Sequence, residues 1–304
     1  FVIWTQVGSF LVFGAVVYMG TLTGSADYES IRLFKFKPNE VWTLYALLFI
    51  GFGIKVPIWP SHYWLTKTHV EAPSGFSIYL SGFLVKTALY GFFKLNNLIL
   101  FEGAHYLCIA IVVIGVIDAS LKLWAQSDLK KIVAYCTVQE MNMIFLLFLT
   151  GDSMIIVCGI LFSAAHAFLS ALMFFLVDCI YRRCHSRSVF AVQGLLQQTP
   201  NLAIAILIMC VLYSGLPGTL KFSCELNLLI VLSELGLLPV FVIVTSANII
   251  GVIGFSKNWF NAIFNLPSKE LDKPMLDLSW KEICIIAFTI GFFILVNGWA
   301  WFVI

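Results

Sequence analysis

Polar interruptions divide this chain into nine apolar segments, each long enough to cross a lipid bilayer. A bilayer core about 30 Å thick requires about 20 apolar residues per helix. The predicted spans are 1–22, 41–60, 74–95, 104–124, 129–149, 154–181, 199–234, 237–256 and 280–303. With 61% hydrophobic and 11% charged residues, the chain of 304 residues is too apolar for a soluble protein. We therefore expect an all-α, polytopic membrane helical bundle that forms a single membrane domain over residues 1–304.

Two of these segments carry signals for an interrupted helix. In segment 41–60, Lys55 stands directly before two nearby prolines. Segment 199–234 is too long for one straight crossing and contains Ser-Gly-Leu-Pro-Gly-Thr at 214–219. Proline removes a backbone donor and glycine weakens a helix, so we expect discontinuous helices at both places. Two interrupted helices at corresponding places are typical of repeat-built transporters.

Ionisable side chains in the middle of apolar segments indicate an ion path. A lysine near the bilayer centre costs about 2.5–3.5 kcal/mol, so Lys55 and Lys86 need polar surroundings. His166 is also central, although a core histidine bonded to a backbone carbonyl would explain it equally well. Glu225 follows the second interruption by about two helical turns. The four residues form a series of titratable groups, one per helix and at similar depth, which suits a proton relay.

Other charged residues in the segments allow more than one interpretation. Glu140 lies about eleven residues into its segment, which places it about 16 Å deep at 1.5 Å per residue. We expect it to face another helix or a water-filled path, because an unpaired acid there would be costly. Asp118 and Lys122 are four residues apart, and an interfacial ion pair on one helical face explains them without a function.

The sequence lacks the motifs of soluble enzymes and of metal proteins. It contains no GxxxxGK, GxSxG or HExxH pattern. The eight cysteines occur singly without a CxxC motif, and we interpret them as apolar filler. Cys179, Cys184 and His185 lack a second ligand pair, so we expect no bound iron, zinc or haem. A net charge of +2 with dispersed basic residues argues against nucleic acid as a partner.

Basic residues gather on one side of the predicted spans. That side receives Lys67, Lys122, Lys130, Lys131, Arg182, Arg183, Arg187, Lys257, Lys269 and Lys273. The opposite side receives little beyond Arg32, Lys35, Lys37 and Lys94. By the positive-inside rule, the first side faces the cytoplasm or the mitochondrial matrix.

Several sequence strings together resemble a known family. They are IKVPIWPSHYWL at 54–65, HVEAP at 69–73, GFLVK at 82–86, DLKKIVAY at 128–135 and LPGT at 216–219. With these strings the chain resembles the subunit 4 family of NADH:ubiquinone oxidoreductase, or respiratory complex I, one of three antiporter-like membrane subunits. The match runs from the first span to roughly the last. The HVEAP and LPGT strings favour subunit 4 over its two relatives.

The resemblance implies an antiporter-like fold and a role for each matched residue. Lys55 is similar to the lysine of the family's broken seventh helix, and Lys86 to the connecting lysine of the eighth. His166 is similar to the relay histidine of the eleventh helix, and Glu225 to the terminal acid of the broken twelfth. His185 resembles a second histidine near the exit on the negative side.

The resemblance also implies a function and a location. The chain would be a proton-translocating membrane-arm subunit of an NADH:ubiquinone reductase, with no cofactor and no redox chemistry of its own. Its partners would be other membrane-arm subunits and lipids in the mitochondrial inner membrane, with a bacterial plasma membrane as the alternative. Two other functions stay open: a cation/proton antiporter subunit, and a structural subunit with an inactive channel.

The chain departs from the family pattern in three respects. Family members have about fourteen helices, and the match begins at the sixth, so the glutamate that partners Lys55 is expected from a separate chain or from a preceding N-terminal part. Glu140 stands where the family usually has histidine, and Lys221 stands where an uncharged residue is usual. Lys221 and Glu225 are four residues apart and could pair on one helical face.

Overall fold

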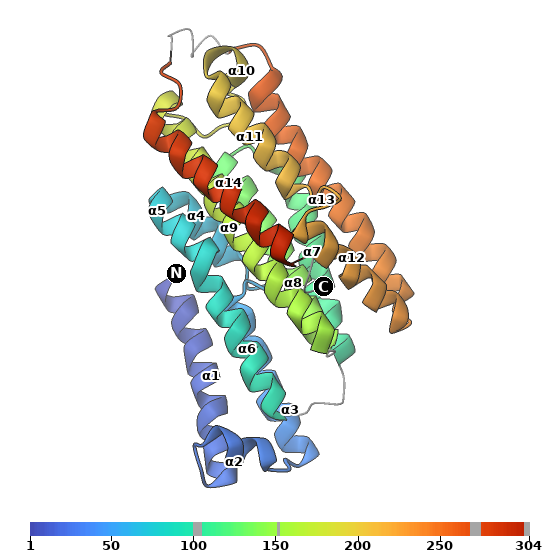
Figure 1. The fold of residues 1–304 in the computed structure, drawn as a ribbon. Coiled ribbons are helices and arrows are strands. Elements are labelled where there is room, and N and C mark those ends of the chain that lie inside the picture. Colours follow the sequence, from blue (N-terminus) through green and yellow to red (C-terminus); the bar gives the residue numbers. More distant parts are fainter. Residues whose placement is uncertain (100–104, 151–152, 268–274, 301–304) are drawn as a thin grey trace.

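The computed structural model describes residues 1–99, 105–150, 153–267 and 275–300. Within these ranges every regular element is a helix, as expected for an all-α membrane bundle. Figure 1 shows α1 and α3 at one edge of the bundle and α11–α13 at the other, with α8 and α9 between them. The elements are α1 (Val2–Thr23), α2 (Tyr28–Leu33), α3 (Pro38–Lys55), α4 (Tyr63–Glu71), α5 (Ser74–Tyr79), the π-helical turn η1 (Leu80–Leu84), α6 (Val85–Ile99), α7 (His105–Ala125), α8 (Leu129–Thr150), α9 (Ser153–Cys184), α10 (Leu195–Gln198), α11 (Pro200–Tyr213), α12 (Leu220–Glu234), α13 (Leu238–Phe264) and α14 (Trp280–Ala300).

Seven helical stretches in the described ranges are long and apolar enough to cross a membrane. They are α1, the continuous run α5–η1–α6, α7, α8, α9, α13 and α14. The two predicted discontinuous helices are also confirmed. The first consists of α3 and α4, and the second of α11 and α12.

At both interruptions, side chains bond to the backbone groups that the helix leaves unpaired. At the first, Trp64 Nε1 donates to the carbonyl oxygen of Ile54 at 2.7 Å. At the second, the Leu220 amide donates to Asn297 Oδ1 of α14 at 2.6 Å. Gly215 there has φ +74°, a left-handed conformation that glycine adopts without steric cost. Such partners allow irregular backbone at membrane depth, because an unpaired polar group in lipid costs several kcal/mol, on the order of 2–7.

Two predicted boundaries were wrong. The segment predicted at 41–60 is helical only to Lys55, and its second half continues as α4 to Glu71, because seven non-helical residues, 56–62, separate the two helices. The segment predicted to end at residue 256 continues to Phe264. Polar residues there are compatible with the helix because Asn258 Nδ2 donates to the Leu123 carbonyl at 3.0 Å.

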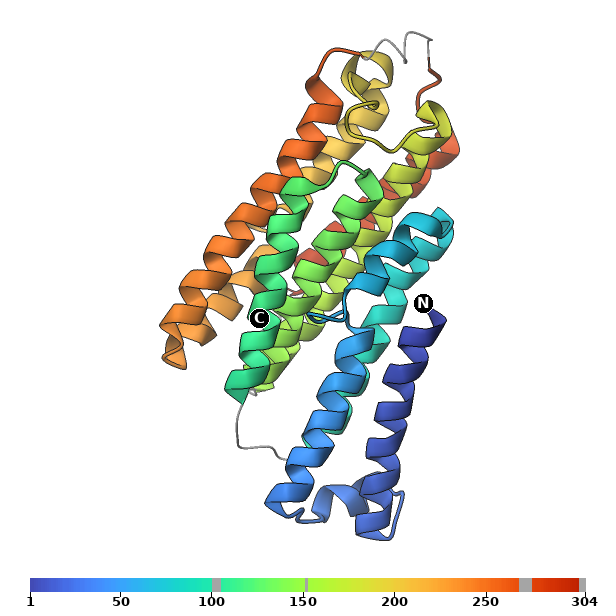
Figure 2. The same cartoon turned by 180° about the vertical axis from the view of Figure 1, so that it is seen from behind.

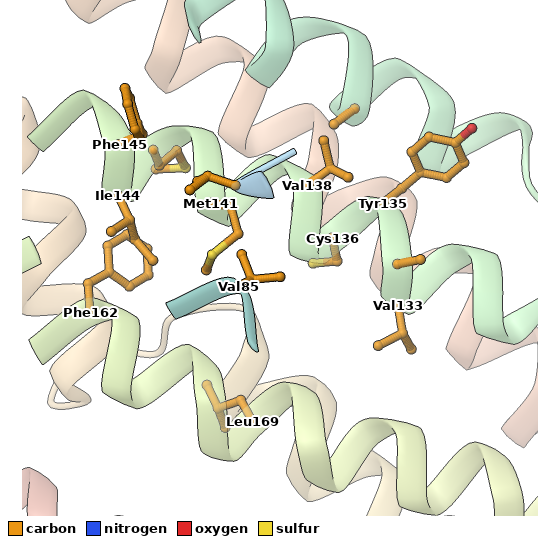
Figure 3. Packing of buried hydrophobic residues seen from close by; sticks show 14 of the residues in the cluster. Val85, Val133, Tyr135, Cys136, Val138, Met141, Ile144, Phe145, Phe162 and Leu169 are labelled. Atoms are coloured by element: carbon orange, nitrogen blue, oxygen red, sulfur yellow. The ribbon is translucent and has the colours of Figure 1, made fainter. Parts of the chain in front are cut away.

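Helix α8 forms the centre of the bundle. All of the 18-residue apolar window in this helix is buried inside the protein. A helix that is apolar and buried all round belongs to the interior of the bundle and presents no side to lipid. Figure 3 shows α8 residues such as Phe145 and Met141 packed towards Phe162 and Leu169 of α9 and Val85 of α6. Between Ile132 and Leu149 of α8, a polar side chain therefore lies in the interior of the protein whichever direction it points.

Helix α1 packs closely against α3 and leaves its remaining surface exposed. A Cβ atom at Gly8 would lie 2.7 Å from the backbone oxygen of Gly51, so glycine is required for this approach. On the outer face, Ile3 is 80% exposed and Phe10 is 72% exposed. The outer face of α1 is therefore apolar and uncovered within this chain.

Candidate functional site

Glu140 of α8 forms the centre of a buried ionic cluster. Its Oε2 lies 2.7 Å from His166 Nδ1 of α9, and its Oε1 lies 2.6 Å from Lys221 Nζ of α12. The three side chains are at most 3% exposed. Lys221 also donates to the carbonyl oxygen of Tyr213, the last residue of α11, so its ammonium bonds to the backbone at the interruption.

The cluster continues from Lys221 to Glu225 and on to α13. Lys221 Nζ lies 3.6 Å from Glu225 Oε1, which confirms that the two residues pair on one face of α12. Glu225 Oε2 accepts from Asn248 Nδ2 at 3.2 Å, and Asn248 Oδ1 accepts from Gln139 Nε2 at 3.2 Å. The polar line therefore runs from α9 through α8 and α12 to α13.

Lys86 approaches the cluster from α6. The π-helical turn η1 precedes it, and Lys86 Nζ donates to the Ser81 carbonyl at the start of that turn. Ser81 Oγ in turn shares a hydrogen bond of 3.1 Å with Thr137 Oγ1 of α8. Through Ser81 and Thr137, Lys86 is connected to the helix that carries Glu140. Its ammonium forms no ion pair within the described ranges.

Two cavities adjoin the acidic groups. A small one of about 10 Å³ is lined by Glu140, Lys221 and Asn248, which is about the volume that one water molecule requires. A larger one of about 300 Å³ lies between α12 and α13 and includes Glu225 and Asn248 in its wall. Asn248 lines both cavities, and Glu225, which contacts Lys221, lines the larger one, where most of the other lining residues are apolar.

Lys55 lies in a separate place, at the end of α3. It borders a cavity of about 330 Å³ whose polar wall residues include Thr5 and Ser9 of α1. Within the described part of the chain its ammonium has neither a hydrogen bond nor an ion pair. Of Lys55, Lys86, His166 and Glu225, the structure links His166 to Glu225 through Glu140 and Lys221, whereas Lys55 lies apart. Their role as one relay stays a prediction.

His185 lies outside the buried cluster, just beyond the end of α9. It is exposed and borders a surface cavity of about 400 Å³ together with Asp128 and Arg187. Nineteen residues separate it from His166 along the chain. The part of that separation that lies in α9, from His166 to Cys184, spans about 27 Å at 1.5 Å per residue. Its predicted role near an exit stays a prediction.

None of the cysteines is paired in a disulfide, and some of them bond to neighbouring side chains. Six of the eight are buried, and all are free. Cys179 Sγ lies 3.6 Å from Glu282 Oε1, and Cys184 Sγ lies 3.6 Å from Met275 Sδ. The described residues contain no group of three or more histidine, cysteine or acidic side chains that could hold a metal ion.

Comparison with known proteins identifies the family. Residues 1–251 match the model of the family described as NADH:quinone oxidoreductase/Mrp antiporter, TM. The chain belongs to this family. The resemblance inferred from the motifs is thereby confirmed.

Among curated members of the NADH:quinone oxidoreductase/Mrp antiporter family, the chain is similar to NADH-ubiquinone oxidoreductase chain 4 of Paramecium tetraurelia. The identity is 56% over 290 residues, covering 94% of this chain and 60% of the relative. NADH-ubiquinone oxidoreductase chain 4 of Dictyostelium discoideum is 31% identical over 268 residues, covering 86% of this chain and 49% of that relative. The chain thus spans less than two thirds of the length of these relatives.

Two solved structures show the same fold. A chain of respiratory complex I from Thermus thermophilus with bound NADH superposes with a TM-score of 0.89 at 22% identity, covering 97% of this chain and 63% of that chain. A chain of the Mrp complex from Dietzia sp. DQ12-45-1b gives a TM-score of 0.81 at 16% identity, covering 97% and 65%. With this family membership and its apolar helices, the chain is a multi-pass membrane protein.

Several polar residues around the buried ionic cluster were not predicted from the sequence. Gln139, Asn248 and Tyr213 contact the cluster, but uncharged residues in apolar segments gave no signal. His62 was noted only as part of a motif, yet it joins the predicted ion pair of Asp118 and Lys122. A central amide in an apolar run, as at Asn248, is the signal that could have been used.

Proposed function

We propose that this chain is a proton-translocating membrane-arm subunit of respiratory complex I, in which NADH oxidation and quinone reduction take place in other subunits. The observation that carries the proposal is the buried line from His166 through Glu140 and Lys221 to Glu225. The similarity to chain 4 of Paramecium and Dictyostelium supports this assembly and a mitochondrial inner membrane location.

The charges of the cluster explain how a proton could pass through it. When Lys86, Lys221, Glu140 and Glu225 are all ionised, their charges cancel. Glu140 then accepts from His166 Nδ1, so the neutral ring carries its lone pair on Nε2, which is buried and has no partner among the described residues. A proton bound there makes the cluster positive, and the low interior dielectric makes that excess charge unfavourable.

Lys221 offers the next step towards the larger cavity. Its ammonium lies 2.6 Å from Glu140 and 3.6 Å from Glu225, so a small movement of its flexible side chain exchanges one carboxylate for the other. Transfer of a proton from Nζ to Glu225 Oε1 leaves a neutral amine, which regains a proton from the His166 imidazolium through Glu140. Glu225 then releases its proton into the cavity of about 300 Å³.

Lys55 needs a counter-charge from outside the described residues. We propose that a neighbouring helix of the complex packs on the apolar outer face of α1 and brings a carboxylate to the Lys55 cavity. An unpaired ammonium at membrane depth is costly, which supports such a partner. Other membrane-arm subunits and lipids are the proposed neighbours of the remaining exposed surface.

Replacing Lys86 by Met tests the proposal, because methionine keeps the apolar stem and removes the charge. Vesicles that contain the whole complex are given NADH and a quinone, and protons pumped per electron are measured beside complex content. We expect fewer protons per electron at normal content. An unchanged ratio would favour a structural subunit with an inactive channel.

A second candidate is a cation/proton antiporter subunit, which the family description and the similarity to an Mrp complex chain favour. The two functions differ in their ion. Proton movement that requires sodium and continues without NADH would support the antiporter, whereas sodium-independent pumping driven by NADH supports the first candidate.

A further inference from the structure

Helix α14 contacts the second interrupted helix through the side chain of Asn297. Its Oδ1 accepts a hydrogen bond of 2.6 Å from the backbone amide of Leu220, the first residue of α12. The first amides of a helix have no partner within that helix, so a buried helix start needs acceptors from elsewhere. Both residues are buried, with Asn297 8% and Leu220 1% exposed. Asn297 therefore supplies, from another helix, an acceptor for the start of α12.

A second acceptor at this helix start comes from the residue before it. Thr219 Oγ1 accepts from the Phe222 amide at 3.3 Å, as threonine at the N-cap position commonly does. Lys221 lies between Leu220 and Phe222 in the sequence. The amides on both sides of Lys221 are thus bonded to side chains, one local and one from α14. The backbone position of Lys221 depends on both bonds.

That backbone position matters because the Lys221 ammonium contacts two carboxylates at different distances. Its Nζ lies 2.6 Å from Glu140 Oε1 and 3.6 Å from Glu225 Oε1. Hydrogen bonds between an ammonium and a carboxylate are about 2.7–2.9 Å long, so about 1 Å separates a bond that is made from one within reach. Displacing a reacting group by about 1 Å can lower a rate about 100-fold. A comparable shift at the start of α12 would take Lys221 away from one of its partners.

Helix α14 can hold the start of α12 because it is itself bonded to α9. Figure 1 shows α14 lying across α9, and Figure 2 shows the same arrangement from the opposite side, with α14 behind α9. Near the beginning of α14, Glu282 Oε2 lies 2.7 Å from Arg183 Nη2 of α9. Asn297 follows Glu282 by 15 residues, which corresponds to about 22 Å along a helix. The two polar contacts therefore lie towards opposite ends of α14.

The rest of α14 makes few demands for a polar residue. Only 17% of its apolar window is buried. Ile286, Phe293 and Asn297 are buried and lie at helical spacing on one face. The first two are apolar, as a packing face requires. A polar side chain within an apolar membrane helix is costly unless it is bonded, so an asparagine at this place indicates a specific bond. If that bond served packing alone, its loss would lower the amount of complex and leave the activity of each complex unchanged.

We propose that Asn297 is a positioning residue for proton transfer: through the Leu220 amide it holds the start of α12 where the Lys221 ammonium reaches both Glu140 and Glu225. This inference rests on the proposed proton translocation. Asn297 carries no proton, and its amide oxygen stays an acceptor throughout. Its effect on transfer passes through the backbone to Lys221.

Two substitutions of Asn297 separate the acceptor from the rest of the side chain. Asn297→Leu keeps a similar volume and removes the acceptor. Asn297→Asp keeps an oxygen that can accept from Leu220, and a negative charge at a helix N-terminus is favourable. Thr289→Val is the matched control on α14, because Thr289 Oγ1 donates to the Ile285 carbonyl of the same helix.

Leu220→Pro removes the same bond from the donor side, because proline has no backbone N–H. Proline is favourable as the first residue of a helix, and the residue before it must be extended. Thr219 meets that condition, with φ −93° and ψ 150°. The backbone can therefore accept proline at this position.

The measurement is protons pumped per electron in vesicles that contain the whole complex, with complex content determined in parallel. We expect a lower ratio of protons to electrons in Asn297→Leu, recovery in Asn297→Asp, and an unchanged ratio in Thr289→Val. A normal ratio in Asn297→Leu would overturn the proposal. If Asn297→Leu prevents assembly, Leu220→Pro decides: a lowered ratio supports the positioning role, and a normal ratio overturns it.

Lys86→Met, measured in the same vesicles, distinguishes this proposal from the proposed function. A lowered ratio in Lys86→Met with a normal ratio in Asn297→Leu removes the positioning role and leaves proton translocation standing. Normal ratios in both variants remove both.

Discussion

Replacing Glu140 by Gln leaves the Lys221 ammonium buried with one carboxylate neighbour fewer. Glu140 is its closest acid, at 2.6 Å, and Glu225 stays at 3.6 Å. Removing one partner of a buried ion pair costs about 3–5 kcal/mol, because the other charge stays in a poorly solvated place. The remaining contact with Glu225 places the expected cost at the lower end, about 3 kcal/mol.

Removing Lys221 as well should recover much of that loss. In Glu140→Gln with Lys221→Met, neither charge of the pair is left, and replacement of a whole buried pair by uncharged groups is often close to neutral. The two substitutions should therefore be strongly non-additive, with a coupling of about 1–3 kcal/mol for residues in direct contact. Pumping should not recover with stability, because the double variant lacks both relay groups.

The assay compares complex content and protons pumped per electron in the two single variants and the double variant. Content should be lowest in Glu140→Gln and higher in the double variant, while pumping should be low in all three. Strictly additive losses of content would show that the two side chains do not interact. Normal pumping in the double variant would refute the relay through this pair, whatever its content.

Three further outcomes follow from single contacts. Asn248→Leu removes the amide that bonds to the terminal carboxylate at 3.2 Å, so pumping should fall while content stays normal; equal pumping would place the amide outside the path. Gly8→Ala would put a Cβ atom 2.7 Å from the backbone oxygen of Gly51, so it should cost about 1–3 kcal/mol and lower content, whereas Gly14→Ala, with no atom within 4 Å, should not. Trp64→Phe removes the donor to a carbonyl at the first interruption, so content should fall by an amount corresponding to about 1–3 kcal/mol, measured against the unsubstituted complex.

The interruptions of the two helices could be predicted because their causes are local. Proline and glycine act on the backbone within one or two turns, so Pro57 and the 214–219 stretch were sufficient to place both breaks. The pairing of Lys221 with Glu225 was equally local, since residues four apart share a helical face. The extension of α13 to Phe264 was missed because Asn258, one of its polar residues, bonds to another helix.

The centre of the site could not be predicted because it depends on helix packing. Glu140 and Lys221 are 81 residues apart, and no periodicity records which helices become neighbours. Helix α8 is buried all round, so it has no lipid-facing side from which the direction of Glu140 could be read. The same limit applies to His62, which meets Asp118 only when the first interrupted helix packs beside α7.

Glu140 and Lys221, which the resemblance predicts to depart from the family pattern, form an ion pair with each other. By the resemblance, Glu140 would add a negative charge where histidine is expected, and Lys221 would add a positive charge where an uncharged residue is expected. Considered singly, Glu140 would be a buried carboxylate with only the His166 imidazole beside it, and Lys221 would keep only the Glu225 carboxylate at 3.6 Å. At 2.6 Å they cancel, so the net charge between His166 and Glu225 is unchanged. It follows that histidine at position 140 should be better tolerated when Lys221 is also replaced by an uncharged residue, because histidine alone leaves Lys221 with the more distant Glu225, at 3.6 Å, as its carboxylate neighbour.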